Sequence, residues 1–194
     1  QKILEISIEE KATGEISAGA GVGTDGTSLA FAVKENNWLG RGINLKTDIF
    51  LTEEKIMGNL SVTNPNYNYT GNAVSAGVDI SSTDMTETSG YKSSNTGFSI
   101  GTEFEQYRDF FLNPALSLSF EDIEVQDSAS AALKKMDGSF TNLDFTYGIT
   151  ADKRNQRFNP TDGYRAKFSQ KIPLIIDSSD IVNGLDVSKY HTFS

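Results

Sequence analysis

The stretch GEISAGAGVGT, residues 14–24, alternates strictly between two kinds of side chain. The apolar set comprises Ile16, Ala18, Ala20 and Val22, and the other set comprises Glu15, Ser17, Gly19 and Gly21. Successive side chains of a β-strand point to opposite faces of the sheet. This period of two therefore predicts a strand with one apolar face and one polar, glycine-rich face.

The same alternation recurs along the rest of the chain. Apolar residues, interrupted by Thr47, Gly58 and Thr102, fall on alternate positions over 29–33, 43–51, 56–62, 74–80, 98–104, 116–120, 143–149 and 164–168, and a last strand begins near Leu185. The pattern predicts an all-β fold of about ten antiparallel strands in up-and-down order. It leaves two architectures open. In a soluble sandwich the apolar faces meet each other, whereas in a transmembrane barrel they meet lipid.

The connections between the strands separate these two architectures. Four of them carry aromatic residues, and most also carry Gly or Pro, at 36–42, 64–71, 105–109 and 157–164. The opposite set includes two polar, mostly longer loops, at 83–95 and 122–142, and residues 128–136 of the second loop predict a short helix. Aromatic turns on one rim and longer polar loops on the other favour an outer-membrane barrel with a periplasmic aromatic rim.

Composition excludes several classes of function. The net charge is −9, and no basic cluster is longer than a pair such as Lys134-Lys135, so nucleic acid is not an expected partner. The chain has no cysteine, which excludes disulfides and thiolate chemistry. No apolar run approaches the roughly 18 residues of a membrane-spanning helix.

No motif predicts a catalytic residue, a metal site or a cofactor. Residues 21–26 match the spacing GxGxxG, but a strand follows where a dinucleotide site needs a helix, so a glycine-rich strand and hairpin turn are predicted instead. His191 is the single histidine and has no cysteine with which to bind a metal. Pairs of carboxylates such as Glu53-Glu54 lack the spacing of a calcium loop and are interpreted as solvated charges.

Four motifs resemble a known family in their order and spacing. They are EKATGEISAGAG at 10–21, NWLGRG at 37–42, SVTNP at 61–65, and DKRN at 152–155 followed by RFNPTDGY at 157–164. Together they resemble the BamA family of outer-membrane assembly factors, within the superfamily of POTRA and bacterial surface antigen barrels. The resemblance implies that residues 1–11 end the last POTRA domain. It also implies that residues 12–194 form the N-terminal portion, about ten of about sixteen strands, of a barrel in the Gram-negative outer membrane.

The same resemblance implies an insertase, which is not an enzyme. Such a protein folds nascent outer-membrane proteins into lipid, with accessory lipoproteins as expected partners. Its first strand would pair with a substrate strand at a lateral gate through the backbone of Glu15, Ile16, Ser17, Ala18, Gly19, Ala20, Gly21 and Val22. The glycines of this strand have two possible roles. They either weaken the seam between the first and the last strand of the barrel, so that the seam can open, or serve only the curvature of the barrel.

Other functions stay open at this point. A related assembly or translocation barrel, such as TamA or a two-partner secretion translocator, would share these features, and a passive porin, an adhesin barrel or a soluble sandwich lectin would share fewer. The chain lacks an initial Met and stops within a strand, so both ends are expected to be cut. About ten strands of a larger barrel are not expected to close alone, because open edges leave backbone groups unpaired in lipid.

Overall fold

The computed structural model describes residues 9, 11–23, 26–175 and 180–192. Its strands are β1 (Gly14–Gly23), β2 (Gly26–Trp38), β3 (Ile43–Thr52), β4 (Lys55–Tyr67), β5 (Asn72–Met85), β6 (Tyr91–Tyr107), β7 (Phe110–Leu112), β8 (Ala115–Val125), β9 (Gly138–Asp152), β10 (Asp162–Ile175) and β11 (Val182–His191). One 3-10 turn, η1 (Leu133–Met136), precedes β9. No helix in the described part of the chain is long and apolar enough to cross a membrane.

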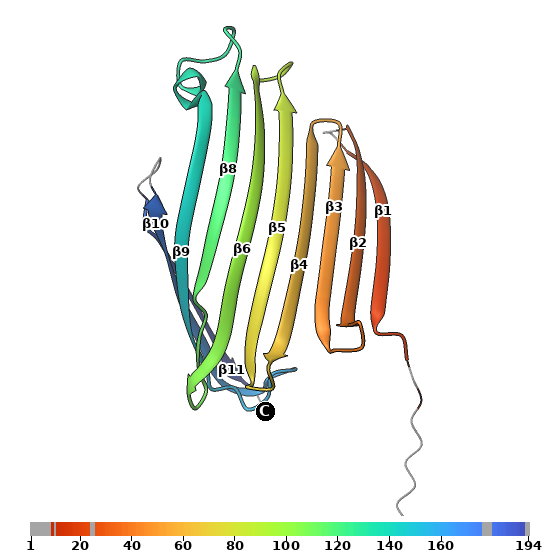
Figure 1. The fold of residues 1–194 in the computed structure, drawn as a ribbon, viewed down its shortest axis with the longest axis vertical. Coiled ribbons are helices and arrows are strands. Elements are labelled where there is room, and N and C mark those ends of the chain that lie inside the picture. Colours follow the sequence, from red (N-terminus) through yellow and green to blue (C-terminus); the bar gives the residue numbers. More distant parts are fainter. Residues whose placement is uncertain (1–8, 10, 24–25, 176–179, 193–194) are drawn as a thin grey trace, which may run out of the picture.

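All the strands lie in one antiparallel sheet that follows chain order (Figure 1). Both β7 and β8 pair with β6 on one side and with β9 on the other. They are therefore two segments of one strand, interrupted at Asn113 and Pro114. Counted in this way the sheet has ten strands, which confirms the predicted all-β meander.

The register places the predicted apolar residues on one continuous face, called here the outer face. Ala18 pairs with Phe31 and Phe31 with Ile49 across β1, β2 and β3. At the far end of the sheet Ile149 pairs with Phe168 and Phe168 with Leu185. Since directly paired residues of an antiparallel ladder share a face, the outer face runs from β1 to β11.

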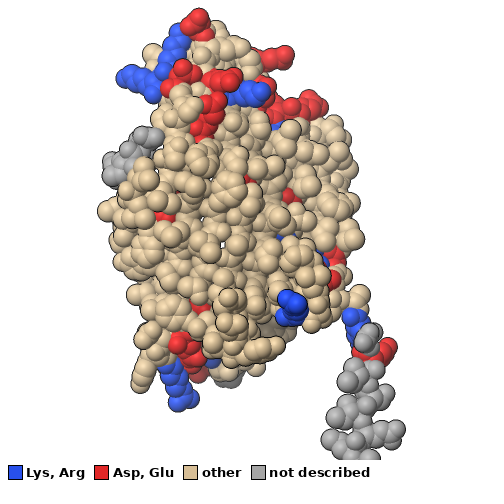
Figure 2. Space-filling model, viewed as in Figure 1, with Lys and Arg blue, Asp and Glu red and all other residues tan. Residues whose placement is uncertain are grey.

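No second layer covers this outer face. Ile123 is the sole hydrophobic residue in the described part of the chain that counts as buried, at 9% exposure. A soluble sandwich would bury its apolar side chains between two sheets, and the structure contains one sheet. The sandwich alternative is therefore excluded. Figure 2 shows a broad middle belt of mainly uncharged residues between two charged ends, which suits a surface that contacts lipid.

The opposite, inner face is polar. One of its rows joins Ser17, Ala32, Asp48, Asn59 and Asp79 across the first five strands. A neighbouring row joins Glu15, Lys34, Lys46 and Ser61. Alternation in the sequence therefore predicted correctly which residues share each face.

The connections also alternate between two rims. The aromatic rim, at the lower end in Figure 1, holds the turns 39–42, 68–71, 108–109 and 153–161, together with the start of β1. The opposite rim holds the connections 53–54, 86–90 and 126–137. The predicted division of the connections between two rims is confirmed by this arrangement.

Three predicted boundaries were wrong. Only residues 86–90 of the predicted loop 83–95 connect β5 to β6, and only 126–137 of the predicted loop 122–142 lie outside β8 and β9. The helix expected at 128–136 is reduced to η1. In both loops the polar flanks continue as strand because they pair in register, as Thr83 does with Ser93. The predicted POTRA end at 1–11 lies outside the described residues except for 9 and 11, which have no secondary structure.

Candidate functional site

The candidate site is the free edge of β1, where the eight residues predicted from the sequence lie. Strand β1 begins the sheet and pairs with β2 only, while β11 forms the other edge. All ten residues of β1 are exposed. Among the described residues, β1 and β11 are thus the two strands whose second side meets no neighbour.

The ladder between β1 and β2 determines which backbone groups are free. The N–H of Asn36 donates to the carbonyl of Thr13 at 3.2 Å, so these two residues form a hydrogen-bonded pair. In an antiparallel ladder, residues alternately direct both their N–H and C=O toward one neighbour and then toward the other side. The odd residues from Thr13 to Gly23 therefore face β2. The even residues Ile16, Ala18, Ala20 and Val22 point their backbone groups outward from the sheet edge.

The same even residues present their side chains to the outer face. Ile16 is 72% exposed and Val22 is 87% exposed. Between them Ala18 and Ala20 form one side of a shallow groove of about 460 Å³, whose other walls include Leu29, Phe31 and Leu51. An added strand would meet four free N–H and C=O pairs and an apolar surface at the same edge.

Among the odd residues of β1, the glycines at 19, 21 and 23 leave part of the inner face of the edge without side chains. A Cβ on Gly19 would have no neighbouring atom within 4 Å, and one on Gly21 would lie 3.0 Å from the Ser28 hydroxyl. Glycine contributes no side chain to a cross-strand pair, and its backbone loses more entropy when it is ordered. Both properties make β1 a weakly held strand.

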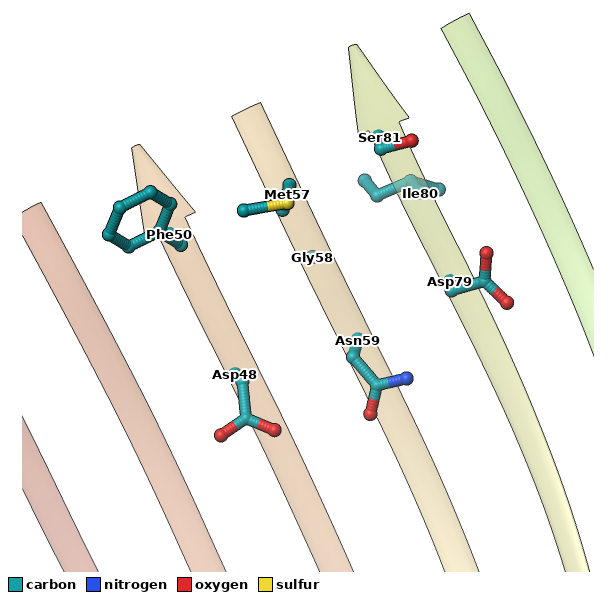
Figure 3. A pocket seen from close by; sticks show the side chains of 8 residues that line it. All are labelled: Asp48, Phe50, Met57, Gly58, Asn59, Asp79, Ile80 and Ser81. Atoms are coloured by element: carbon teal, nitrogen blue, oxygen red, sulfur yellow. The ribbon is translucent and has the colours of Figure 1, made fainter. Parts of the chain in front are cut away.

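A hollow of about 380 Å³ opens on the inner face two strands away from this edge. Figure 3 shows Asp48, Asn59 and Asp79 in one line across β3, β4 and β5, with Phe50 and Met57 in the next row. Lys46 pairs with Asp48 at 3.0 Å, and the amide of Asn95 donates to Asp79 at 3.2 Å. No group of three or more potential metal ligands occurs among the described residues, so this hollow gives no metal site.

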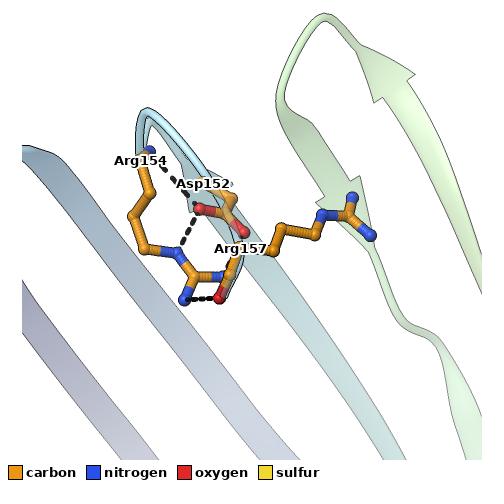
Figure 4. A network of polar contacts seen from close by, with 3 residues as sticks. All are labelled: Asp152, Arg154 and Arg157. Atoms are coloured by element: carbon orange, nitrogen blue, oxygen red, sulfur yellow. Dashed lines mark hydrogen bonds and ion pairs between the residues drawn. The ribbon is translucent and has the colours of Figure 1, made fainter. Parts of the chain in front are cut away.

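The loop between β9 and β10 is held by a polar network at the aromatic rim (Figure 4). Arg154 donates from Nε and from a terminal nitrogen to the two carboxylate oxygens of Asp152, each at 2.7 Å. The hydrogen bond to Asp152 raises the pKa of Arg154 further above its usual value, so the guanidinium stays charged at any physiological pH. Arg157 extends away from this pair and lies 5.5 Å from the centre of the Phe111 ring. The network has a structural rather than a catalytic arrangement.

Sequence reasoning missed a repeated turn at the same rim. The side-chain oxygen of Asn37 accepts from the N–H of Gly42 at 2.7 Å, and that of Asn66 accepts from Gly71 at 2.8 Å. The second, third and fifth residues after each asparagine have positive φ, at 39, 40 and 42 and at 68, 69 and 71. The two connections therefore have one geometry. Its signal in the sequence is the spacing Asn-x4-Gly with an aromatic residue directly after the asparagine.

Comparison with known proteins agrees with this architecture. A family model described as the Omp85 superfamily domain matches residues 37–194. The outer membrane protein assembly factor BamA of Neorickettsia risticii (strain Illinois) is 26% identical over 173 residues, which cover 87% of this chain and 23% of that protein. A crystal structure of BamA from Haemophilus ducreyi lacking POTRA domains 1–3 superimposes with a TM-score of 0.62 at 20% identity, over 89% of this chain and 36% of that one. The chain thus spans about a quarter of its curated relative and about a third of the solved structure.

Proposed function

The chain belongs to the Omp85 superfamily, and from this premise we propose that its β1 edge receives a strand of a nascent outer-membrane protein during insertion into the membrane. Its relatives are β-barrel proteins of the Gram-negative outer membrane, and the described sheet is one part of such a barrel wall. The proposed activity is that of an insertase, acting through strand pairing and not through covalent chemistry.

The direction of the β1 backbone groups is the observation that carries this proposal. In hydrocarbon each unpaired N–H or C=O costs several kcal/mol, so a nascent strand cannot enter lipid without a hydrogen-bonding partner. The outward N–H and C=O groups of Ile16, Ala18, Ala20 and Val22 offer hydrogen-bonding partners to the backbone groups of such a nascent strand. Strand addition at an exposed edge is an established way in which sheets bind extended segments.

The two faces of β1 support the same role. Because the residues with free backbone groups also present apolar side chains to the outer face, an added strand would arrive with its own apolar side chains in lipid. The bare glycine positions on the inner face leave the strand weakly held, which favours exchange of its partner. We propose further that the aromatic rim faces the periplasm, where a nascent chain and accessory lipoproteins would approach.

Proline substitution at Ala18 tests the backbone claim directly. Proline has no N–H, and the N–H of Ala18 points away from β2, so Ala18→Pro removes one outward donor and leaves the β1–β2 ladder intact. The matched control is Ala18→Val, which keeps the N–H and the apolar side chain. Insertion of a barrel substrate into liposomes is measured with the full-length protein, after a check by heat-shifted electrophoretic mobility that each variant is folded.

We expect Ala18→Pro to insert substrate about tenfold more slowly and Ala18→Val to keep most of its activity, since an unpaired buried polar group costs about 1–3 kcal/mol. A folded Ala18→Pro variant with wild-type activity would exclude strand pairing at this edge. Equal loss in both variants would assign the effect to the side chain instead. If the protein is instead a related translocator, it would carry a soluble polypeptide across the liposome membrane. Neither substitution would then change the rate of barrel insertion.

A further inference from the structure

A pocket lies between the two repeated turns and has one charged residue in its lining. This pocket, called here the rim pocket, has a volume of about 690 Å³ and is lined by residues 40–43 and 64–69. Arg41 is the single charged residue in that lining, and no ion pair of the described residues involves it. The protein as a whole carries a net charge of −9, whereas the lining of this pocket holds one cation and no carboxylate.

The position of the rim pocket in the sheet places it beside the lipid-facing surface. Leu45 and Val62 pair on the outer face, and Ile43 and Asn64 lie two residues further toward the aromatic rim on the same strands. Side chains two apart on a strand share a face, so Ile43 and Asn64 belong to the outer face as well. The pocket therefore opens where the apolar surface ends and the polar end of the barrel begins, which is the depth of the lipid headgroups.

The turns that form the pocket hold bulky residues in a costly backbone conformation. Leu39 and Tyr69 both have a φ of 58°, a left-handed value that costs a residue with a side chain about 1–2 kcal/mol. Tyr69 is nevertheless 95% exposed and Leu39 is 69% exposed. Such strain persists where a function requires it. Here it aims an amphipathic ring and an apolar side chain away from the protein, at a level where the membrane interface would cover both.

We propose that the rim pocket binds the phosphate of an anionic phospholipid headgroup. The planar guanidinium of Arg41 matches phosphate oxygens in a two-pronged geometry. The amides of Asn64 and Asn66 and the hydroxyl of Tyr67 supply further donors in the same lining. The acyl chains would then run along the outer face beside Ile43 and Leu45. This inference goes beyond the proposed insertase function and does not depend on it.

Lipid retention by the full-length protein tests the proposal. The protein, purified in detergent and freed of native lipid, is mixed with equal amounts of phosphatidylglycerol and phosphatidylcholine, and the bound lipids are counted by native mass spectrometry. The variants are Arg41→Gln and Arg41→Lys, with Arg108→Gln as matched control. Arg108 is an exposed arginine of the neighbouring rim turn and does not line the pocket.

We expect the wild-type protein to retain phosphatidylglycerol in preference to phosphatidylcholine, and Arg41→Gln to lose this preference by roughly fivefold, the factor for one basic residue near an anionic surface. Arg41→Lys should keep part of it because the charge remains, and Arg108→Gln should keep all of it. The proposal is overturned if Arg41→Gln retains the wild-type preference, or if Arg108→Gln loses as much, since general surface charge would then explain the binding.

Discussion

Gly19 lies opposite Ala30 in the β1–β2 ladder, and a Cβ placed on Gly19 would meet no atom within 4 Å. The position thus has room for a larger residue although the sequence has none there. Steric need does not explain this glycine in the described sheet. The two interpretations of the β1 glycines, a seam that opens and a strand that must curve, can therefore be separated by adding a side chain.

Gly19→Val should slow substrate insertion without harming the fold. A β-branched residue favours strand by up to about 1 kcal/mol over a poor strand former, and its Cβ at this position would meet no atom within 4 Å. The valine would hold β1 more firmly as a strand, so separation of β1 from its partner at the seam should become several-fold rarer. Insertion of a barrel substrate into liposomes by the full-length protein measures the effect.

The control for this change is Ala32→Val, which adds the same branched side chain to the inner face of β2. Strand β2 is paired on both sides, so we expect insertion by this variant to stay at the wild-type rate. If Gly19→Val also inserts at the wild-type rate while folded, the glycines serve curvature and not opening. Gly21→Val is a less direct test because its side chain would crowd the Ser28 hydroxyl.

Asn37→Ala and Asn66→Ala should each destabilise their turn by a similar amount. Each change removes the side-chain acceptor of one turn hydrogen bond, to Gly42 or to Gly71, at a cost of roughly 0.5–1.5 kcal/mol. Because the two turns share one geometry, equal losses are expected from both. Denaturant unfolding of the full-length protein in detergent measures them.

Asn72→Ala is the comparison variant for these turns, since Asn72 contacts Thr70 through its backbone N–H. We expect its unfolding midpoint to match that of the wild-type protein. A loss at Asn37 alone would mean that the two turns are alike in shape but differ in their contribution to stability. No loss at either would show that water replaces the asparagine oxygen at no cost.

The strands and their faces could be predicted from the sequence because the pleat of a strand imposes a period of two. That period placed Phe31, Ile49 and Phe168 on one face without knowledge of any contact. Strand ends were not predictable in the same way. Polar residues such as Thr83 and Ser93 extend β5 and β6 beyond the apolar rows, and polarity alone cannot distinguish such an extension from a loop.

The candidate site came from the resemblance to a known family and not from the residue pattern. The structure places residues 15–22 on an edge strand of the described sheet, and their role in strand pairing stays a prediction. Which of their backbone groups face outward depends on the phase of the ladder, fixed by the contact between Thr13 and Asn36. Contacts between distant residues, such as Lys153 and Asp109, likewise depend on register and turn shape rather than on local pattern.

Neutralising Asp109 should have a small effect that depends on salt. Lys153 Nζ lies 2.7 Å from Asp109 Oδ2, but both side chains are more than a third exposed, so the pair contributes about 0.2–1 kcal/mol. Asp109 has a φ of 65°, and asparagine tolerates that conformation, so Asp109→Asn isolates the charge. Unfolding midpoints at low salt and at about 1 M salt, where screening is strong, should differ from wild type only at low salt. A difference that persists at high salt would show that the hydrogen bond, not the charge, stabilises the rim.

Asp152→Asn should loosen the loop between β9 and β10 and expose it to protease. The carboxylate of Asp152 accepts two hydrogen bonds from Arg154, and both side chains are mostly buried, with exposures of 12% and 16%. An asparagine offers one oxygen in place of two and no charge, so the guanidinium keeps one weaker contact. Limited trypsin digestion of the full-length protein in detergent should then cut after Arg154 several-fold faster than in the wild type.

Asp162→Asn, in the same hairpin, serves as control because Asp162 contacts Asn155 through its backbone. Equal rates of cleavage in all three proteins would mean that the backbone bonds of Asn155, and not the ion pair, hold this loop.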